Sequence, residues 1–153
     1  MLILVRPFSP LAIRGFDSYG GGAFGASRDG GKRVHHGLDL IAKAGTIVKS
    51  TCKGVVTKIG WPYADDLSYY YIEITTPEGY QVRHFYVLPG VRLQEPVEAG
   101  ETHLGIVQML GLRYPKITNH IHLEIKNKGE YIDPTPYLLD EETSCIPEIP
   151  TTT

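Results

Sequence analysis

Four of the six histidines of this 153-residue chain lie in two short clusters. The later cluster lies in residues 119–125, NHIHLEI, where apolar and polar residues alternate. This alternation predicts a strand, in which side chains two apart point to the same face. His120, His122 and Glu124 then share one face, and the two imidazoles start roughly 6.6 Å apart. One imidazole could bind a metal ion while the other faces whatever the ion holds, although a half-buried strand with a polar face has the same pattern.

The earlier cluster is residues 35–39, HHGLD. In a strand, His35, Gly37 and Asp39 share a face, and Gly37 leaves space between the other two. His35 and Asp39 could therefore bind one ion. A helix would also place residues four apart on one face. Gly37 and the β-branched residues nearby favour the strand.

Imidazoles and a carboxylate are donors that suit Zn²⁺. Three protein ligands leave a fourth position open for water, as a catalytic zinc site requires. Neither cluster contains a thiolate, and carboxylates are too few for Ca²⁺, so other metals fit less well. Bound Zn²⁺ lowers the pKa of its water toward about 7 and polarises a carbonyl. The two clusters together predict a metal site of this kind.

The elements that must position these residues are predicted to be strands. A composition with 17 Gly, 11 Pro and 10 Tyr, and without long Ala-rich or Leu-rich runs, predicts an all-β or β-dominated fold with many turns. The glycine-rich segment 15–31, which also carries aromatic residues, predicts an ordered loop that lines a groove. Residues 1–140 are expected to form one domain and residues 141–153 a flexible tail. Strands are predicted at residues 3–6, 34–41, 46–50, 55–59, 69–75, 80–87, 104–109 and 119–125.

Charge and composition argue against several classes of partner. The net charge is −2, the pI is near 6.3 and no long basic run exists, so neither nucleic acid nor an anionic membrane is the expected partner. No apolar run is long enough to span a membrane, and the first residues do not have the pattern of a signal peptide. Two cysteines do not form a disulfide framework; we expect Cys52 to be a buried thiol and Cys145 to lie in the tail.

Several segments, in order and spacing, resemble peptidase family M23, the zinc metallopeptidases of the lysostaphin and LytM type that act on peptidoglycan. The resemblance runs from about residue 20 to residue 138. It implies a small antiparallel β-structure with a groove between loops. It also implies that His35, Asp39 and His122 bind Zn²⁺, and that His120 is a catalytic histidine that orients water or stabilises the oxyanion. The matching segments are GASR (25–28), HHGLDL (35–40), AGTIV (44–48), GVV (54–56), VEAG (97–100), NHIHLEI (119–125) and DP (133–134).

The resemblance leaves the second catalytic residue open. The family pattern Tyr-x-His-Leu corresponds here to residues 82–88, VRHFYVL. One register places His84 in the catalytic position and another places Tyr86 there; in a regular strand these two residues share a face. His36 matches a variable position and is expected to be structural. Glu124 either holds a ligand imidazole by its other nitrogen or is a solvated strand residue.

The same segments also resemble, locally, the leukocyte cell-derived chemotaxin branch of the family. That branch keeps the zinc ligands but is regarded as lacking peptidase activity. Its cysteine pairs are absent here, which favours a microbial or phage enzyme. The function expected is a monomeric zinc endopeptidase that cleaves peptidoglycan peptides at the bacterial cell wall, in phage lysis or in a virion, with export by a holin, a virion or another route. The alternative is a zinc-stabilised binding module without turnover.

Overall fold

The computed structural model describes residues 2–138, which form mostly β-strands and loops. A 3-10 turn, η1 (Asp29–Gly31), follows the first strand, and a short helical stretch begins at Thr135. The β-dominated, antiparallel fold class predicted from the sequence is confirmed. The strands are β1 (Ser27–Arg28), β2 (Arg33–Val34), β3 (Leu38–Ile41), β4 (Ile47–Lys49), β5 (Gly54–Gly60), β6 (Tyr71–Thr75), β7 (Gln81–Phe85), β8 (Val87–Pro89), β9 (Pro96–Val97), β10 (His103–Val107), β11 (His120–Asn127) and β12 (Glu130–Ile132).

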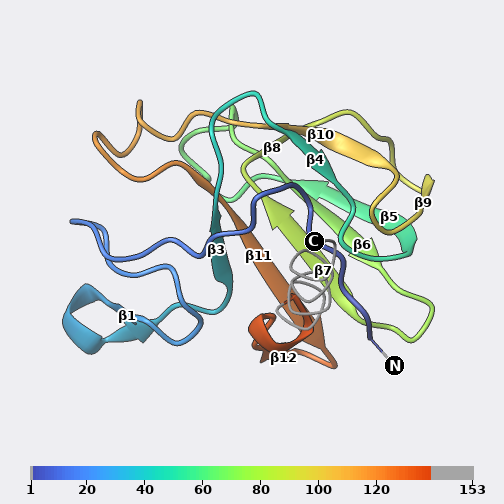
Figure 1. Ribbon diagram of the computed structural model, residues 1–153, viewed down its shortest axis with the longest axis horizontal. Helices are drawn as coiled ribbons and strands as arrows, with labels where there is room; N and C mark the ends of the chain where they lie inside the picture. Colours follow the sequence, from blue (N-terminus) through green and yellow to red (C-terminus); the bar gives the residue numbers. More distant parts are fainter. Residues whose placement is uncertain (1, 139–153) are drawn as a thin grey trace, which may run out of the picture.

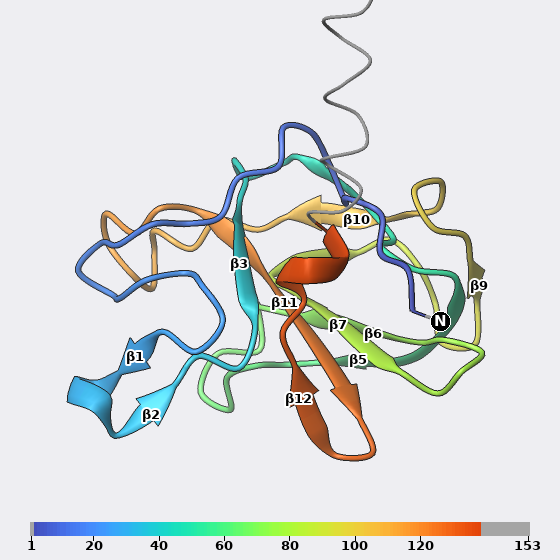
Figure 2. The same cartoon turned by 60° about the horizontal axis from the view of Figure 1, so that its bottom comes forward.

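Strand β11 is central to the arrangement. It pairs antiparallel with β7 along one edge and with β3 and β12 along the other. The main sheet continues from β7 through β6 and β5 to β9, and a smaller sheet has the order β4-β10-β8. Figure 1 shows the smaller sheet along one side of the main sheet, and Figure 2 shows the β1–β2 hairpin standing apart from both. The pairing of β11 with β3 brings the two histidine clusters of the sequence together.

Alternate residues of the strands form the core. The core side chains of the main sheet include Ile72, Ile74, Ile121, Leu123 and Ile125, all with no exposed surface. Residues of the smaller sheet belong to the same cluster. Full burial of one such aliphatic side chain stabilises the fold by roughly 1.5–3 kcal/mol. Because side chains alternate along β11, His120, His122 and Glu124 point to the face opposite these apolar residues.

Three predicted strands differ from the structure. Residues 3–6 form no strand, and the predicted strand 34–41 is interrupted at residues 35–37. At this break the backbone of His35 forms hydrogen bonds with loop 23–26 instead of a neighbouring strand. The predicted strand 80–87 is interrupted at Tyr86, which separates β7 from β8, and the other predicted strands are present with shifts at their ends.

The segment that precedes β1 packs along β3. The backbone N–H of Arg14 donates to Asp39, and that of Ile41 donates to Ala12, both at 2.8–2.9 Å. Figure 1 shows this segment, in dark blue, crossing the molecule toward β3. The segment therefore reaches the strand that carries one of the candidate ligands.

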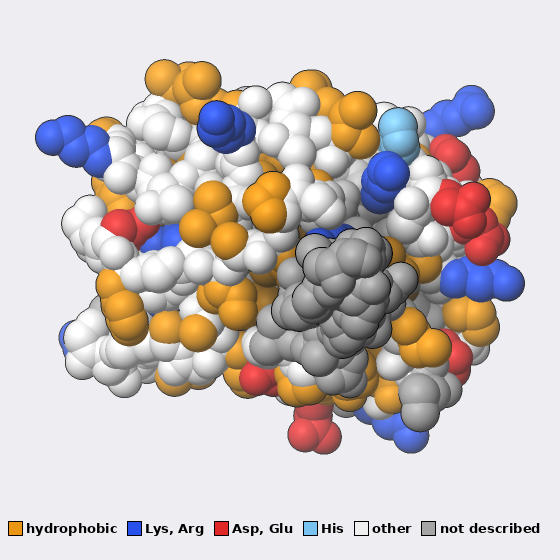
Figure 3. Space-filling view, viewed as in Figure 1, with side chains coloured by type: hydrophobic (Ala, Val, Ile, Leu, Met, Phe, Trp, Pro, Cys, Tyr) orange, Lys and Arg blue, Asp and Glu red, His pale blue; other side chains and the backbone are white. Residues whose placement is uncertain are grey.

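The remaining expectations about cysteines and surface charge have simple outcomes. Cys52 is buried as predicted, and burial raises the pKa of its thiol to about 12. Cys145 and the predicted tail, residues 141–153, lie outside the described residues. On the face shown in Figure 3, Lys and Arg side chains lie scattered, some at the edge and some within the face. In the described part of the chain, no helix is long and apolar enough to cross a bilayer.

Candidate metal centre

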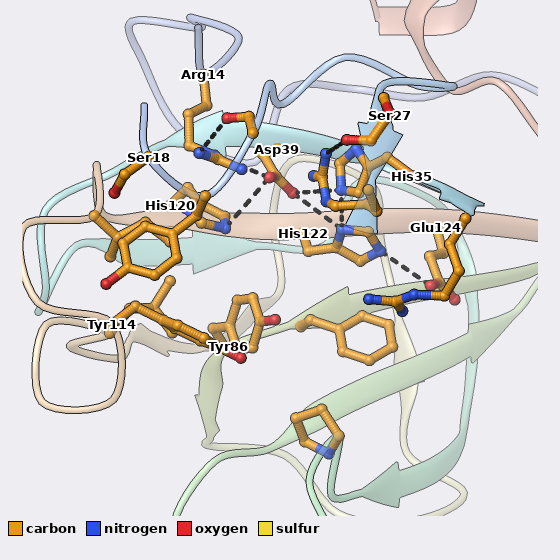
Figure 4. A pocket seen from close by; sticks show the side chains of 18 of the residues that line it. Arg14, Ser18, Ser27, His35, Asp39, Tyr86, Tyr114, His120, His122 and Glu124 are labelled. Atoms are coloured by element: carbon orange, nitrogen blue, oxygen red, sulfur yellow. Dashed lines mark hydrogen bonds and ion pairs between the residues drawn. The ribbon is translucent and has the colours of Figure 1, made fainter. Parts of the chain in front are cut away.

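His35, Asp39 and His122 converge on one point at the edge of the main sheet (Figure 4). His35 Nε2 lies 2.9 Å from His122 Nδ1, and Asp39 Oδ1 lies 3.1 and 3.0 Å from these two nitrogens. His35 comes from the loop before β3, Asp39 from β3 and His122 from β11, where Asp39 and His122 are direct partners in the strand register. The three side chains expose only 8%, 2% and 12% of their surface, respectively. The structure thus brings together the three predicted ligands.

The outer nitrogens of both imidazoles face hydrogen-bond acceptors. His35 Nδ1 lies 3.0 Å from the carbonyl oxygen of Ala23, and His122 Nε2 lies 3.0 Å from Glu124 Oε1. Because a carbonyl or carboxylate oxygen can only accept, each outer nitrogen carries a proton. In a neutral imidazole the inner nitrogen then offers its lone pair to the cluster. Two lone pairs and the Asp39 carboxylate repel each other unless a cation lies between them, which is the arrangement of a metal site.

The electrostatics of the cluster show the same need for a cation. Burial lowers the pKa of His122, but hydrogen bonds to Asp39 and Glu124 outweigh burial and raise that pKa to about 9. Burial raises the pKa of Asp39, whereas hydrogen bonds from His122 and His35 hold it well below its usual range. In the absence of metal, a proton on His122 therefore supplies positive charge near neutral pH. A divalent cation would displace that proton.

Gly37 makes the close approach of β11 possible. A Cβ atom at this position would lie 2.6 Å from His122 Cε1 and Nε2, and 2.5 Å from the carbonyl oxygen of Leu123. The sequence predicted that Gly37 leaves space between His35 and Asp39; the structure shows that the space is filled by the His122 imidazole.

His120 lies beside the cluster without joining it. Its Nδ1 donates to the carbonyl oxygen of Thr118 at 2.7 Å, and its Nε2 lies 3.4 Å from Asp39 Oδ2. With the proton on Nδ1, the lone pair of Nε2 faces the site. Burial lowers the pKa of His120, although the charge of Asp39 opposes this effect. His120 is therefore a neutral imidazole positioned to accept a proton at Nε2.

The structure separates His84 from Tyr86, which a regular strand would have placed on one face. Tyr86 has φ of 71° and interrupts the alternation between β7 and β8. The Tyr86 ring contacts the His120 ring edge to face, with centroids 5.7 Å apart. His84 instead points into the core with no exposed surface, and the hydroxyl of Thr51 lies 2.9 Å from its Nε2. The expectation of a shared face is therefore wrong, and His84 does not reach the metal cluster.

The sequence model of peptidase family M23 matches residues 33–134, a range that includes His35, Asp39, His120 and His122. The chain belongs to peptidase family M23.

Two curated proteins of related sequence have names that describe different roles. Leukocyte cell-derived chemotaxin-2 of Mus musculus is 31% identical over 126 residues, which cover 82% of this chain and 79% of that protein. The L-Ala–D-Glu endopeptidase of Bacillus subtilis is 32% identical over 137 residues, which cover 84% of this chain and 42% of that protein. The M23 chain described here thus spans less than half of the Bacillus enzyme.

Solved structures confirm the lysostaphin-type fold. The catalytic domain of the antimicrobial peptidase lysostaphin from Staphylococcus simulans has a TM-score of 0.60 and 23% identity, covering 77% of this chain and 90% of that chain. A zinc containing peptidase from Vibrio cholerae has a TM-score of 0.59 and 21% identity, covering 86% of this chain and 39% of that chain. At this level of identity, the likeness establishes the fold alone.

The candidate metal site opens into a groove of about 780 Å³. Part of the glycine-rich segment lines it, including Tyr19 and Gly20, which agrees with the predicted ordered loop. Phe16 of the same segment is 89% exposed and lies outside the lining. His36 is also outside the groove lining; its ring stacks on Tyr131 with centroids 4.2 Å apart.

Two groove residues, Tyr63 and Tyr114, were missed by sequence reasoning. The hydroxyl of Tyr114 donates to that of Tyr63 at 2.9 Å, and the hydroxyls of Tyr63 and Tyr86 are 2.9 Å apart. The guanidinium of Arg113 lies 3.7 Å from the centre of the Tyr63 ring. Tyr63 lies 51 residues before Tyr114, in another loop, so no local spacing in the sequence links Tyr63 to the adjacent pair Arg113 and Tyr114. Burial raises the pKa of Tyr86, which keeps its hydroxyl protonated as a hydrogen-bond donor.

Arg14 is the other missed residue. It is 3% exposed, and its Nε donates to Asp39 Oδ2 at 3.0 Å. It lies outside the range matched by the M23 model, in a stretch with no recognisable motif.

Proposed function

We propose that this protein is a zinc-dependent endopeptidase that hydrolyses peptide bonds in the stem peptides or cross-bridges of peptidoglycan. The observation that carries the proposal is the convergence of His35, Asp39 and His122, with His120 beside them. Family membership supports peptidase chemistry, and the name of the Bacillus subtilis relative supports a peptidoglycan peptide as substrate. The likeness to a zinc containing peptidase of Vibrio cholerae supports zinc as the metal.

The residues fit zinc in both donor type and spacing. Two imidazole nitrogens and one carboxylate oxygen are a usual set for a catalytic zinc ion, which keeps one further position for water or substrate. Metal–ligand distances of about 2.0–2.1 Å in a tetrahedral site place the ligand atoms roughly 3.3 Å apart. The separations of 2.9–3.1 Å between the three ligand atoms are close to this value.

The chain's own residues have distinct tasks in the proposed reaction. When bound, zinc would lower the pKa of a water molecule and polarise the peptide carbonyl. His120 Nε2 takes a proton from the attacking water as the new C–O bond forms, and it later gives that proton to the leaving amine nitrogen. Tyr86 donates a hydrogen bond to the oxyanion that develops on the carbonyl oxygen. Tyr63 holds the Tyr86 hydroxyl in place through the 2.9 Å contact.

This substrate places the protein's action at the bacterial cell wall. We propose a single chain as the active unit, because the ligands, His120 and the groove all come from one chain. A role in phage lysis or in a virion is a narrower form of the proposal. Copurification of the protein with phage particles would test it.

The test uses zinc-loaded protein and purified cell walls of several cross-bridge types. We expect wild-type protein to release new amino groups, and mass analysis of the fragments would identify the bond. His120→Ala should keep zinc but lose turnover by a factor of about 10² to 10⁴. His36→Ala is the matched control and should remain active, because His36 lies outside the groove lining.

An alternative outcome would favour a different function. If wild-type protein with full zinc content binds these walls but releases no amino groups, the chain is a zinc-stabilised binding module. Equal activity of His120→Ala and wild type would leave the enzyme in place but remove the proposed role of His120.

A further inference from the structure

Arg14 lies between two carboxylates next to the proposed zinc site. Its Nε donates to Asp39 Oδ2 at 3.0 Å, and its terminal nitrogen lies 2.7 Å from Asp17 Oδ1. The same terminal nitrogen donates to the carbonyl oxygen of Gly20 at 3.0 Å. The Arg14 side chain is only 2% exposed, so these contacts satisfy a buried charge rather than a surface one. Figure 4 shows the guanidinium reaching Asp39 from the side opposite His122.

A chain of contacts continues from Arg14 to His120. Asp17 Oδ2 accepts the backbone N–H of Thr118 at 3.1 Å, and the carbonyl oxygen of Thr118 accepts Nδ1–H of His120 at 2.7 Å. His120 Nε2 in turn faces Asp39 Oδ2 at 3.4 Å. A path of contacts therefore leads from a proposed metal ligand, Asp39, through Arg14, Asp17 and Thr118 to the proposed proton acceptor, His120.

We propose that Arg14 and Asp17 are positioning residues that fix Asp39 as a ligand through one oxygen and orient His120 toward the site. This inference rests on the proposed zinc centre and adds to it two residues from outside the range matched by the family model. Arg14 occupies Oδ2 of Asp39, which leaves Oδ1 for the metal beside His35 and His122. Asp17 holds Thr118, and Thr118 fixes which nitrogen of His120 carries the proton.

The shape of arginine suits this task better than that of lysine. A planar guanidinium offers donors in fixed directions, so it can bind two carboxylates and a carbonyl at once. The close fit is also visible at Gly22, where a Cβ atom would lie 2.6 Å from Arg14 Cβ and 3.0 Å from Asp39 Cβ. With Arg14 positive and both carboxylates negative, the group has a net charge of about −1, which still favours a cation in the site.

The test measures zinc binding and does not depend on peptidase activity. Competition titration with a chelator gives the Kd for Zn²⁺, and the visible absorption of the Co²⁺ form reports ligand geometry. We expect Arg14→Gln to weaken zinc binding by about 10- to 100-fold and to change the Co²⁺ spectrum, as loss of a partner of a ligand does. Arg14→Lys should lie between wild type and Arg14→Gln. Arg28→Gln is the control, because Arg28 lines the same groove but its guanidinium donates to the Ser27 carbonyl.

Asp17→Ala tests the part of this path that leads to His120. The nitrogen NMR shifts of His120 should show one tautomer, with the proton on Nδ1, in wild-type protein and a mixture of tautomers in Asp17→Ala. A merely structural role for Asp17 would lower stability without changing that tautomer. The Kd of the Arg14→Gln, Asp17→Ala double variant should be close to that of the weaker single variant, since the two residues act through one network.

Each outcome decides a different proposal. If wild-type protein binds no zinc, both the zinc centre and the clamp formed by Arg14 and Asp17 are overturned. If Arg14→Gln binds zinc as tightly as Arg28→Gln and has the wild-type Co²⁺ spectrum, the clamp is wrong and the zinc centre remains. If Arg14→Gln does not fold, Asp17→Ala decides: unchanged zinc affinity together with an unchanged His120 tautomer overturns the clamp.

Discussion

Removal of the metal should make the folded state lose stability as the pH rises above neutrality. In the metal-free protein the pKa of His122 is raised from 6.5 to about 9, a difference of 2.5 units (9 − 6.5). One unit corresponds to about 1.4 kcal/mol, so the protonated His122 stabilises the fold by about 3 kcal/mol. Because the folded pKa is higher than the unfolded one, this contribution is fully present below pH 6.5 and is lost as the pH rises through 9.

His84 has the opposite effect on the acid side. Burial lowers its pKa to about 4. Its neutral form therefore contributes stability above pH 6.5, and this contribution is lost as the pH falls through 4. The metal-free protein should be most stable near pH 6.5 to 7, with a decline on either side that comes from a different histidine.

The assay is urea unfolding at a series of pH values, with and without a chelator. We expect the free energy of unfolding of the chelated protein to fall by about 3 kcal/mol between pH 6.5 and 10. In thermal unfolding of the same samples, this loss corresponds to a fall of about 10 °C in Tm for a domain of this size. The zinc-loaded protein should show little change over the same range, because a ligand nitrogen has no proton left to release. His122→Gln, measured with chelator, is the control and should not show the alkaline decline.

Two results would refute this reasoning. Equal stability of the chelated protein at pH 7 and pH 10 would mean that His122 is not held protonated by Asp39 and Glu124. An alkaline decline that persists in His122→Gln would assign the effect to another group.

Three further predictions concern packing, the second catalytic residue and the end of the chain. Gly37→Ala should lose zinc, as elemental analysis would show, because the added methyl group overlaps His122; full zinc content would contradict the packing described. Tyr86→Phe should keep zinc and lose activity on cell walls by about 10²-fold or more, whereas His84→Ala should unfold at lower urea concentration while the folded protein stays active. The reverse pattern would mean that His84 takes the catalytic role. A chain ending at Asp140 should fold with wild-type Tm by circular dichroism, and failure to fold would show that later residues pack on the core.

Local sequence patterns predicted most of the fold and the two histidine clusters, and the resemblance to peptidase family M23 selected His122 rather than His120 as the third candidate ligand. The alternation in residues 119–125 identified β11 and the face that carries His120 and His122, because period two is a direct consequence of strand geometry. The break at residues 35–37 could not be predicted in this way. It depends on backbone hydrogen bonds between His35 and loop 23–26, and the sequence does not show which distant segment will accept them.

Arg14 lies beyond what any local pattern could indicate. It comes from an irregular segment, and its partners Asp17, Gly20 and Asp39 meet only after that segment pairs with β3. A buried arginine between two carboxylates is a property of the folded chain, since the unfolded chain offers the same residues to water. Residues of this kind become visible only through their contacts.

Tyr86 shows how a strand pattern fails near the end of a strand. A period of two places His84 and Tyr86 on one face only while the backbone stays extended. The positive φ of Tyr86 breaks this condition, so its ring turns to the His120 side while His84 stays in the core. Non-glycine residues rarely adopt this conformation, and such strain is concentrated at functional sites. The positive φ of Tyr86, which made the prediction of a shared face wrong, therefore places a hydroxyl donor at the proposed zinc site.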